Sequence, residues 1–173
     1  MKVRYAFIAR LSKDLYAKNG DLYGPHLDID TLLIRLNIQK EEKILDENIS
    51  GAAIINGGKR RILINISEPD NRRRFTACHE IAHCLAHSDQ ALSVDVQSIT
   101  LLRDPNSSNG ENWREVEANR LAAALLMPEE LLHTEFALSK EFYSTDSLVV
   151  QDLAHKFQVS EQAMLIRLGS IGY

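Results

Sequence analysis

The feature that most constrains this chain is the run His-Glu-Ile-Ala-His at residues 79–83, an H-E-x-x-H pattern. It lies within residues 72–87, where apolar residues recur at helical spacing. On a helix, residues four apart are offset by about 40° and 6 Å, so both imidazoles can converge on one metal ion. A catalytic zinc site uses three protein ligands and one open position. Two imidazoles are therefore insufficient, and a third protein ligand is needed.

Glu80 is the candidate general base of such a site. It lies beside the two histidines on the helix, so its carboxylate can reach a metal-bound water without becoming a ligand. Zinc lowers the pKa of that water to about 7, and the carboxylate accepts a proton as the water attacks a carbonyl. The alternative is a surface helix with two solvated histidines, and the amphipathic setting of the motif argues against it. We interpret His79 and His83 as zinc ligands.

Three residues are candidates for the third ligand. His87 continues the series of histidines, but it lies about 12 Å along the helix axis from His79, too far to share one ion. Asp89 occupies the last position of the longer pattern H-E-x-x-H-x-x-G-x-x-H/D. That pattern turns sharply at a glycine, and Ala86 stands there, so Asp89 is disfavoured without being excluded.

Glu115 is the preferred candidate. It shares one face of a helix expected over residues 112–127 with Asn119, and the alanines on this face allow close approach to the histidine helix. Asn119 can then hydrogen-bond a ligand imidazole. Glu117 points about 200° away from Glu115, so at most one of the two is a ligand. The alternative is that both are solvated acids near a helix N-terminus.

The donor that would stabilise the developing oxyanion is less well defined. A histidine or tyrosine side chain could supply such a hydrogen-bond donor. Tyr143 and His133 are the two candidates.

At these residues the chain resembles the ImmA/IrrE family of zinc-dependent metallopeptidases. The resemblance covers roughly residues 25–170, and it departs from the family at Cys78, where an aliphatic residue or alanine is common, and at Gln158, where glycine is frequent. Neither departure touches the metal chemistry. The matching stretches are residues 74–83, 115–128 and 153–160, together with the hairpin before the first of them.

The resemblance implies a gluzincin-like site with one zinc ion per chain. Its ligands would be His79, His83 and Glu115, with Glu80 catalytic. Family members are bacterial or phage-borne regulators that cleave a repressor with a helix-turn-helix domain. The resemblance therefore implies an endopeptidase whose protein substrate is a transcriptional repressor.

The remaining sequence predicts an α+β fold. The first 40 residues indicate two helical pieces, the second capped by Asp28 or Asp30. Residues 51–66 predict a hairpin around Asn-Gly-Gly-Lys, and a further strand is expected at residues 98–102, before a loop. Two or three helices are expected after residue 128, the last with Ser160 as N-cap.

These elements predict two units. Residues 1–130 would form a zincin-like metallopeptidase domain, with a small antiparallel sheet packed on the histidine helix and on the helix that carries Glu115. Residues 131–173 would form a C-terminal helical extension packed on it, with a helix-turn-helix-like segment at 147–169.

That segment raises the alternative of a non-catalytic regulator that binds a repressor or DNA without cleavage. A recognition helix normally brings several basic or amide groups to DNA, whereas here the second helix offers only Glu161, Gln162 and Arg167. An intact Glu80 favours the enzyme, because a pure binder needs no base there. We therefore do not expect DNA to be a partner.

Composition and cysteine use predict a cytoplasmic protein without a membrane anchor. The net charge is −4, which argues against a polyanion as main partner. The N-terminal apolar run breaks at Arg10, too early for a secretory signal, and no stretch approaches the roughly 18 apolar residues of a membrane span. Cys78 and Cys84 are about 9 Å apart along one helix and cannot pair, so both are expected to be small core residues.

Overall fold

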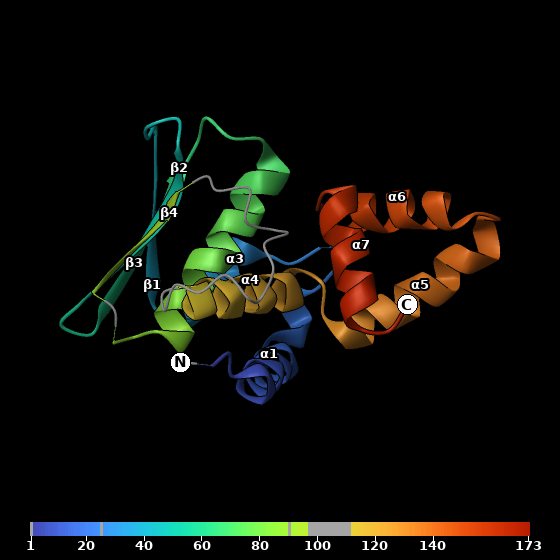
Figure 1. Ribbon diagram of the computed structural model, residues 1–173, viewed down its shortest axis with the longest axis horizontal. Coiled ribbons are helices and arrows are strands. Elements are labelled where there is room, and N and C mark those ends of the chain that lie inside the picture. Colours follow the sequence, from blue (N-terminus) through green and yellow to red (C-terminus); the bar gives the residue numbers. More distant parts are fainter. Residues whose placement is uncertain (1, 25, 90, 97–111) are drawn as a thin grey trace.

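The computed structural model describes residues 2–24, 26–89, 91–96 and 112–173 (Figure 1). The expected strand at 98–102 and the loop after it lie outside the described residues. The helices are α1 (Tyr5–Asn19), the 3-10 turn η1 (Gly20–Leu22), α2 (Ile29–Arg35), α3 (Asp70–Ala86), α4 (Asn112–Leu126), α5 (Glu129–Phe142), α6 (Asp146–Phe157) and α7 (Glu161–Ser170). The strands are β1 (Ile38–Lys43), β2 (Ile49–Asn56), β3 (Lys59–Asn65) and β4 (Leu92–Val96). The chain is therefore α+β, as the sequence predicted.

The sheet is built around the predicted hairpin. Strands β2 and β3 pair antiparallel up to Asn56 and Lys59, and both turn residues have positive φ, 56° at Gly57 and 80° at Gly58. A two-residue turn of this type matches the twist of the strands and favours glycine. Strand order is β1-β3-β2-β4, with β4 antiparallel to β2 and β1 parallel to β3. The sheet is therefore mixed, whereas an antiparallel sheet was expected.

Strands β1 and β4 were not predicted from the sequence. The residues of β1 are Ile-Gln-Lys-Glu-Glu-Lys, and only Ile38 among them is buried. In β4, Ser93 is buried while Leu92 and Val94 are exposed. This is the reverse of the usual pattern, in which apolar residues of a strand are buried and polar ones are exposed. Both are edge strands, held by backbone pairing to a neighbour rather than by an apolar face of their own. Asn37, with φ of 53°, turns the chain from α2 into β1.

Helix α3 covers one face of the sheet, and none of the described helices lies against the other (Figure 1). The covered face carries Ala53, Ile62 and Ile64, all buried. Helix α4 packs on α3, and both Ala118 and Ala122 at this contact are fully buried. Small side chains let the two helix backbones approach closely, so residues of α4 reach the histidine-bearing helix.

The C-terminal helices extend beyond the end of α4, away from the sheet (Figure 1). Ser160 caps α7 by accepting a hydrogen bond from Ala163 N, as predicted. Gln158 ends α6 with φ of 53°, a left-handed conformation that explains why glycine is frequent at this position in the family. Arg167 Nε donates to the Met127 carbonyl at 3.0 Å, which ties α7 to the end of α4. The division at residue 130 stays a prediction.

Both cysteines are free and buried on α3, as the sequence predicted. Burial raises the pKa of each thiol to about 12, so both are protonated and unreactive. Within the described ranges, every helix is too short or too polar to cross a membrane.

Candidate metal centre

Two histidine side chains of α3 face each other in the interior. His79 and His83 are 2% and 1% exposed, and their Nε2 atoms are 3.0 Å apart. Residues four apart on a helix are neighbours, which explains the contact. Two buried imidazoles with their nitrogens turned toward one point are typical of a metal site.

Glu115 brings a carboxylate to the same point from α4. Its Oε2 lies 3.2 Å from His79 Nε2, and its Oε1 lies 3.3 Å from His83 Nε2. The side chain is 38% exposed, whereas both imidazoles are almost wholly covered. The three groups therefore form a cluster in which both imidazoles are covered by protein and only the side chain of Glu115 is partly accessible to solvent.

The spacing of this cluster fits a tetrahedral metal ion. Ligand atoms about 2.0–2.2 Å from zinc in tetrahedral geometry are about 3.3–3.6 Å from one another. The separations here are 3.0, 3.2 and 3.3 Å between donors of three different residues. Among the described residues, His79, His83 and Glu115 are the acidic, histidine and cysteine side chains that gather closely enough to hold an ion. Three ligands leave one coordination position for water or substrate.

Asn119 determines which nitrogen of His79 is available to a metal. Its Oδ1 lies 2.9 Å from His79 Nδ1. Because an amide oxygen only accepts, Nδ1 carries the proton and Nε2 keeps its lone pair. A hydrogen bond of this kind fixes both the tautomer and the orientation of a ligand imidazole.

The carboxyl group of Glu115 is held in its ionised form. Burial alone would raise its pKa, but hydrogen bonds and charge from His79 and His83 outweigh burial, so the pKa lies well below its ordinary value. A metal ligand must be deprotonated. Glu115 meets that requirement throughout the physiological pH range.

Glu80 is fully buried on the side of α3 that faces strand β2. It lies against Gly51, where a Cβ atom would be 3.3 Å from Glu80 Oε1, 2.6 Å from Thr76 Cγ2 and 2.7 Å from the Leu63 carbonyl oxygen. Gly51 therefore permits the close approach of α3 to the sheet. This role of Gly51 was not predicted from the sequence, although a glycine inside an apolar strand is a signal of close backbone approach.

The other two candidates for the third ligand lie outside the cluster. Asp89 is exposed and pairs with Arg114, whose Nη2 is 2.7 Å from Asp89 Oδ2. His87 donates from Nε2 to the Arg114 carbonyl at 3.2 Å. Burial lowers the pKa of His87, so its ring is neutral near pH 7.

Glu117 is not the solvated acid that one sequence interpretation allowed. It is fully buried and accepts hydrogen bonds from Arg4, with Arg4 Nη2 at 2.6 Å from Glu117 Oε2. Burial alone would raise the pKa of Glu117, but the contacts with Arg4 bring it below its ordinary value. The partner could not be identified from sequence because Arg4 and Glu117 are 113 positions apart.

The structure does not bring Tyr143 or His133 to the metal cluster. His133 is on α5 and Tyr143 follows the last residue of that helix, which runs away from the α3–α4 contact (Figure 1). The His133 ring contacts Tyr173, with Nδ1 2.5 Å from the tyrosine hydroxyl. Neither residue is placed to stabilise an oxyanion at this cluster.

Comparison with known proteins agrees with this geometry. A family model described as the IrrE N-terminal-like domain, a peptidase family, matches residues 26–169. The chain belongs to this family. The resemblance to ImmA/IrrE metallopeptidases is thereby confirmed, and it agrees with a cluster of side chains on the H-E-x-x-H helix and on α4 that could hold a metal ion.

One protein similar to this chain is the radiation response metalloprotease IrrE of Deinococcus radiodurans. The two sequences are 31% identical over 110 residues, which is 62% of this chain and 30% of the relative. The chain therefore spans less than a third of the length of that protein. Helix α1 precedes residue 26 and lies outside the family match.

Proposed function

We propose that this protein is a zinc-dependent endopeptidase that hydrolyses a peptide bond in a helix-turn-helix transcriptional repressor and thereby relieves repression. The observation that supports it most is the convergence of His79, His83 and Glu115 at tetrahedral spacing. Membership of a peptidase family and the metalloprotease relative support it independently.

The roles of the residues follow from their positions. His79, His83 and Glu115 would hold the ion, and zinc, when bound, supplies a water of lowered pKa and polarises the scissile carbonyl. Asn119 would keep His79 Nε2 available to the ion by accepting a hydrogen bond from Nδ1. Glu80 accepts the proton of the attacking water and passes it to the leaving amine.

Strand β4 is the element best placed to align an extended substrate. It is an outer strand of the sheet, and its Asp95 pairs with Gly51, the residue that touches Glu80. An extended peptide can add to an outer strand through backbone hydrogen bonds. A substrate bound in this way would be separated by β4 from strand β2, which lies against the general base. Because the bound segment must be extended, we expect it to come from a flexible or locally unfolded part of the repressor.

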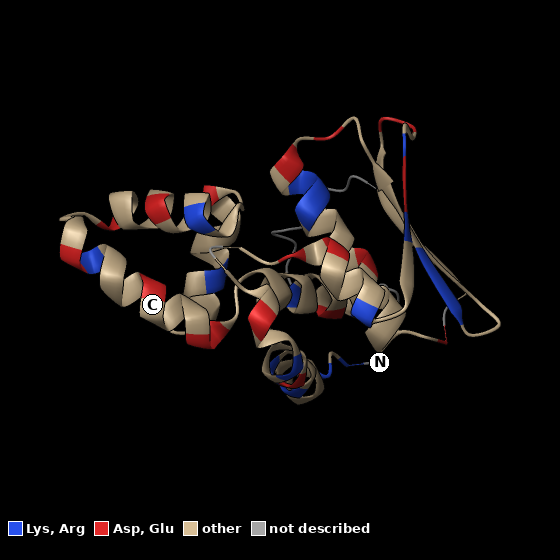
Figure 2. Ribbon diagram, turned by 180° about the vertical axis from the view of Figure 1, so that it is seen from behind, with Lys and Arg blue, Asp and Glu red and all other residues tan. Residues whose placement is uncertain are grey.

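Two further expectations concern location and DNA. The free, buried cysteines suit a reducing compartment, and we place the protein in the cytoplasm. Helices α5–α7 carry acidic and basic residues side by side rather than a basic face (Figure 2). Duplex DNA is therefore not proposed as a partner, since its backbone is recognised by clustered positive charge.

The substitution Glu80→Gln tests the mechanism. It keeps the size of the side chain but removes the base, so we expect a folded protein that still binds zinc. Loss of a general base typically slows a reaction by about 10²–10⁴-fold. The measurement is repressor fragmentation by mass spectrometry, together with a transcriptional reporter, after co-expression with a helix-turn-helix repressor encoded beside this gene.

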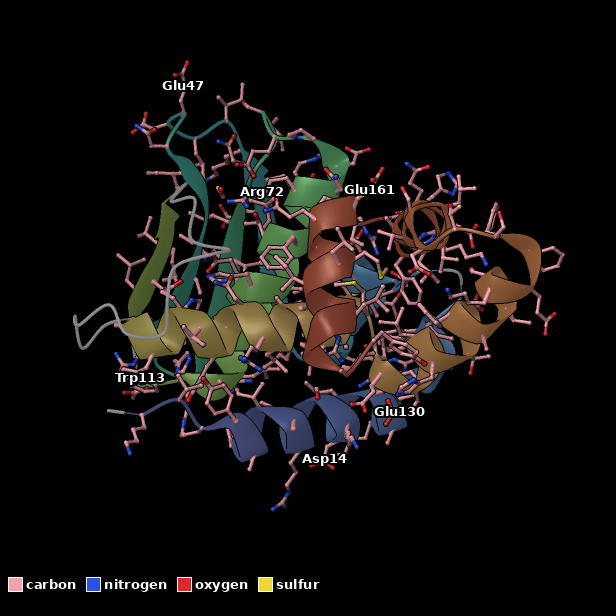
Figure 3. The ribbon with its side chains drawn as sticks, turned by 45° about the vertical axis from the view of Figure 1, so that its right-hand side comes forward. Asp14, Glu47, Arg72, Trp113, Glu130 and Glu161 are labelled. Carbon is pink, nitrogen blue, oxygen red and sulfur yellow. The ribbon has the colours of Figure 1, made fainter. Side chains whose placement is uncertain are left out.

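The exposed Glu47 offers a matched control, because it lies on the loop between β1 and β2, at the far end of the sheet (Figure 3). Glu47→Gln should cleave the repressor as the wild type does. If the protein is instead a non-catalytic regulator, Glu80→Gln should still relieve repression, and no repressor fragment should appear with the wild type or with the variant. That result would overturn the proposed peptidase activity.

A further inference from the structure

A buried ion pair lies next to the candidate metal centre. Glu117 is two residues after Glu115 on α4, and its carboxylate is fully buried. Arg4 donates to it from Nη2 at 2.6 Å, from Nε at 3.1 Å to each oxygen, and from its backbone N at 2.5 Å. A buried carboxylate without a partner is strongly disfavoured. Arg4 is therefore what allows Glu117 to be ionised in the interior.

The same guanidinium contacts three helices. Arg4 Nη2 donates to the Ala86 carbonyl at 3.1 Å, where α3 ends, and lies 3.5 Å from His87 Nδ1. Its Cζ is 4.6 Å from the ring centre of Phe7 on α1 and 5.4 Å from that of Trp113 on α4. Trp113 lies between the beginning of α4 and the segment that leads into α1 (Figure 3). One side chain thus joins the start of α1, the end of α3 and the start of α4.

The three candidate metal ligands differ in how much they depend on this junction. His79 and His83 lie within α3, which is packed along the sheet. Glu115 lies in the first turn of α4, and its side chain is partly exposed. The position of Glu115 therefore depends on how firmly the start of α4 is held. A metal site requires its ligands within about 0.5 Å of the productive geometry, so a small shift of this turn would matter.

We propose that Arg4 is a positioning residue for the metal centre. By pinning Glu117 to the end of α3, it holds the start of α4 where the carboxylate of Glu115 meets the two imidazoles. The inference rests on the proposed zinc site. It also goes beyond the family match, because Arg4 precedes residues 26–169.

The test is the zinc affinity of the full chain, measured by competition with a chromophoric chelator. Loss of a residue that supports a metal ligand typically lowers metal affinity by about 10–100-fold, and we expect Arg4→Ala to fall in that range. Arg4→Lys keeps the charge but loses the two-pronged geometry, so we expect a smaller loss. Arg10→Ala is the matched control on helix α1, which begins directly after Arg4. Arg10 is 84% exposed, and the affinity of this variant should equal that of the wild type.

A second comparison separates positioning from general stability. Glu117→Gln in the Arg4→Ala background removes the unpaired buried charge, so the melting temperature of the metal-free protein should recover toward wild type. The contacts of Arg4 with Glu117 and with the Ala86 carbonyl are still missing in this variant, so zinc affinity should stay low. If zinc affinity recovers together with the melting temperature, or if Arg4→Lys and the double variant both bind zinc as tightly as wild type, the proposal is overturned. Failure of the wild type itself to bind zinc would instead contradict the proposed function, and the positioning role with it.

Discussion

Two helix pairs of this molecule bury very different side chains. The α3–α4 pair buries several polar residues, including Thr76, His79, Glu80, His83 and Glu117. The α6–α7 pair is described in full, and its buried residues are all apolar: Val149, Val150, Leu153, Ala154, Phe157, Met164 and Leu168. Burying polar and ionisable groups is unfavourable unless they are paired. The α3–α4 pair therefore depends on specific partners, such as Arg4 for Glu117 and Asn119 for His79, whereas apolar packing alone suffices for the buried side chains of α6–α7.

The comparison also separates what each pair contributes to the chain. In α6–α7, the predicted helix-turn-helix pattern is satisfied by apolar packing and by the caps at Gln158 and Ser160. In α3–α4, the close contact at the alanines positions donor atoms around one point. All three candidate metal ligands therefore lie in the first pair, and none of them lies in the second.

The largest contrast is expected from removal of the third ligand. Structural zinc sites with four protein ligands bind the ion with about 10–16 kcal/mol, or about 2.5–4 kcal/mol for each ligand, so Glu115→Ala should lower zinc affinity by roughly 100-fold. Asp89→Ala should keep the affinity of the wild type, because Asp89 pairs with Arg114 outside the cluster. Competition titrations of both variants measure this directly. If Asp89→Ala loses the metal and Glu115→Ala does not, the longer metzincin-like pattern is correct.

A smaller effect is expected where α3 meets the sheet. Gly51→Ala places a Cβ atom 2.7 Å from a backbone oxygen and 2.6 Å from Thr76 Cγ2, so the helix and strand must separate. Overpacking of this kind costs about 1–3 kcal/mol of unfolding free energy. It should also slow cleavage, since Glu80 lies at the same contact. Gly20→Ala is the control, because nothing lies within 4 Å of the added atom; equal denaturation midpoints for the two variants would contradict the close approach.

The smallest effect tests the α6–α7 pair. Val149 is fully buried on α6, and Val149→Ala removes two carbon groups, worth about 1.6 kcal/mol of unfolding free energy. Zinc affinity should not change, because none of the candidate ligands lies on these helices. Gln151→Ala, at an exposed position of the same helix, serves as control for helix propensity. A loss of zinc affinity in Val149→Ala, measured at a temperature where the protein is folded, would mean that the two helix pairs are coupled.

The part of the site that sequence could predict is the part that follows helical spacing. Residues four apart on one helix lie on one face, and this spacing alone predicted that His79 lies beside His83 and Glu115 beside Asn119. The assignment of His79, His83 and Glu115 as metal ligands stays a prediction until the metal content is measured. The hairpin and the cap at Ser160 were also predictable, because each depends only on a few residues that are neighbours in the sequence.

The part that sequence could not predict depends on contacts between distant segments. Strand β1 has little apolar character and is held by β3, and Glu117 is buried only because Arg4 reaches it from far along the chain. The need for glycine at position 51 follows only from the packing of α3 on β2, which the sequence does not show. The positions of His133 and Tyr143 could not be predicted either, because residue type alone does not say where α5 runs.

Elemental analysis of the purified chain tests the central claim most directly. Mass spectrometry of metal content, after dialysis against metal-free buffer, should find about one zinc per wild-type chain and a sharp fall in His83→Ala. The fall follows from the loss of one of three convergent donors. Equal metal content in the two proteins, or no metal in either, would contradict a zinc centre between α3 and α4.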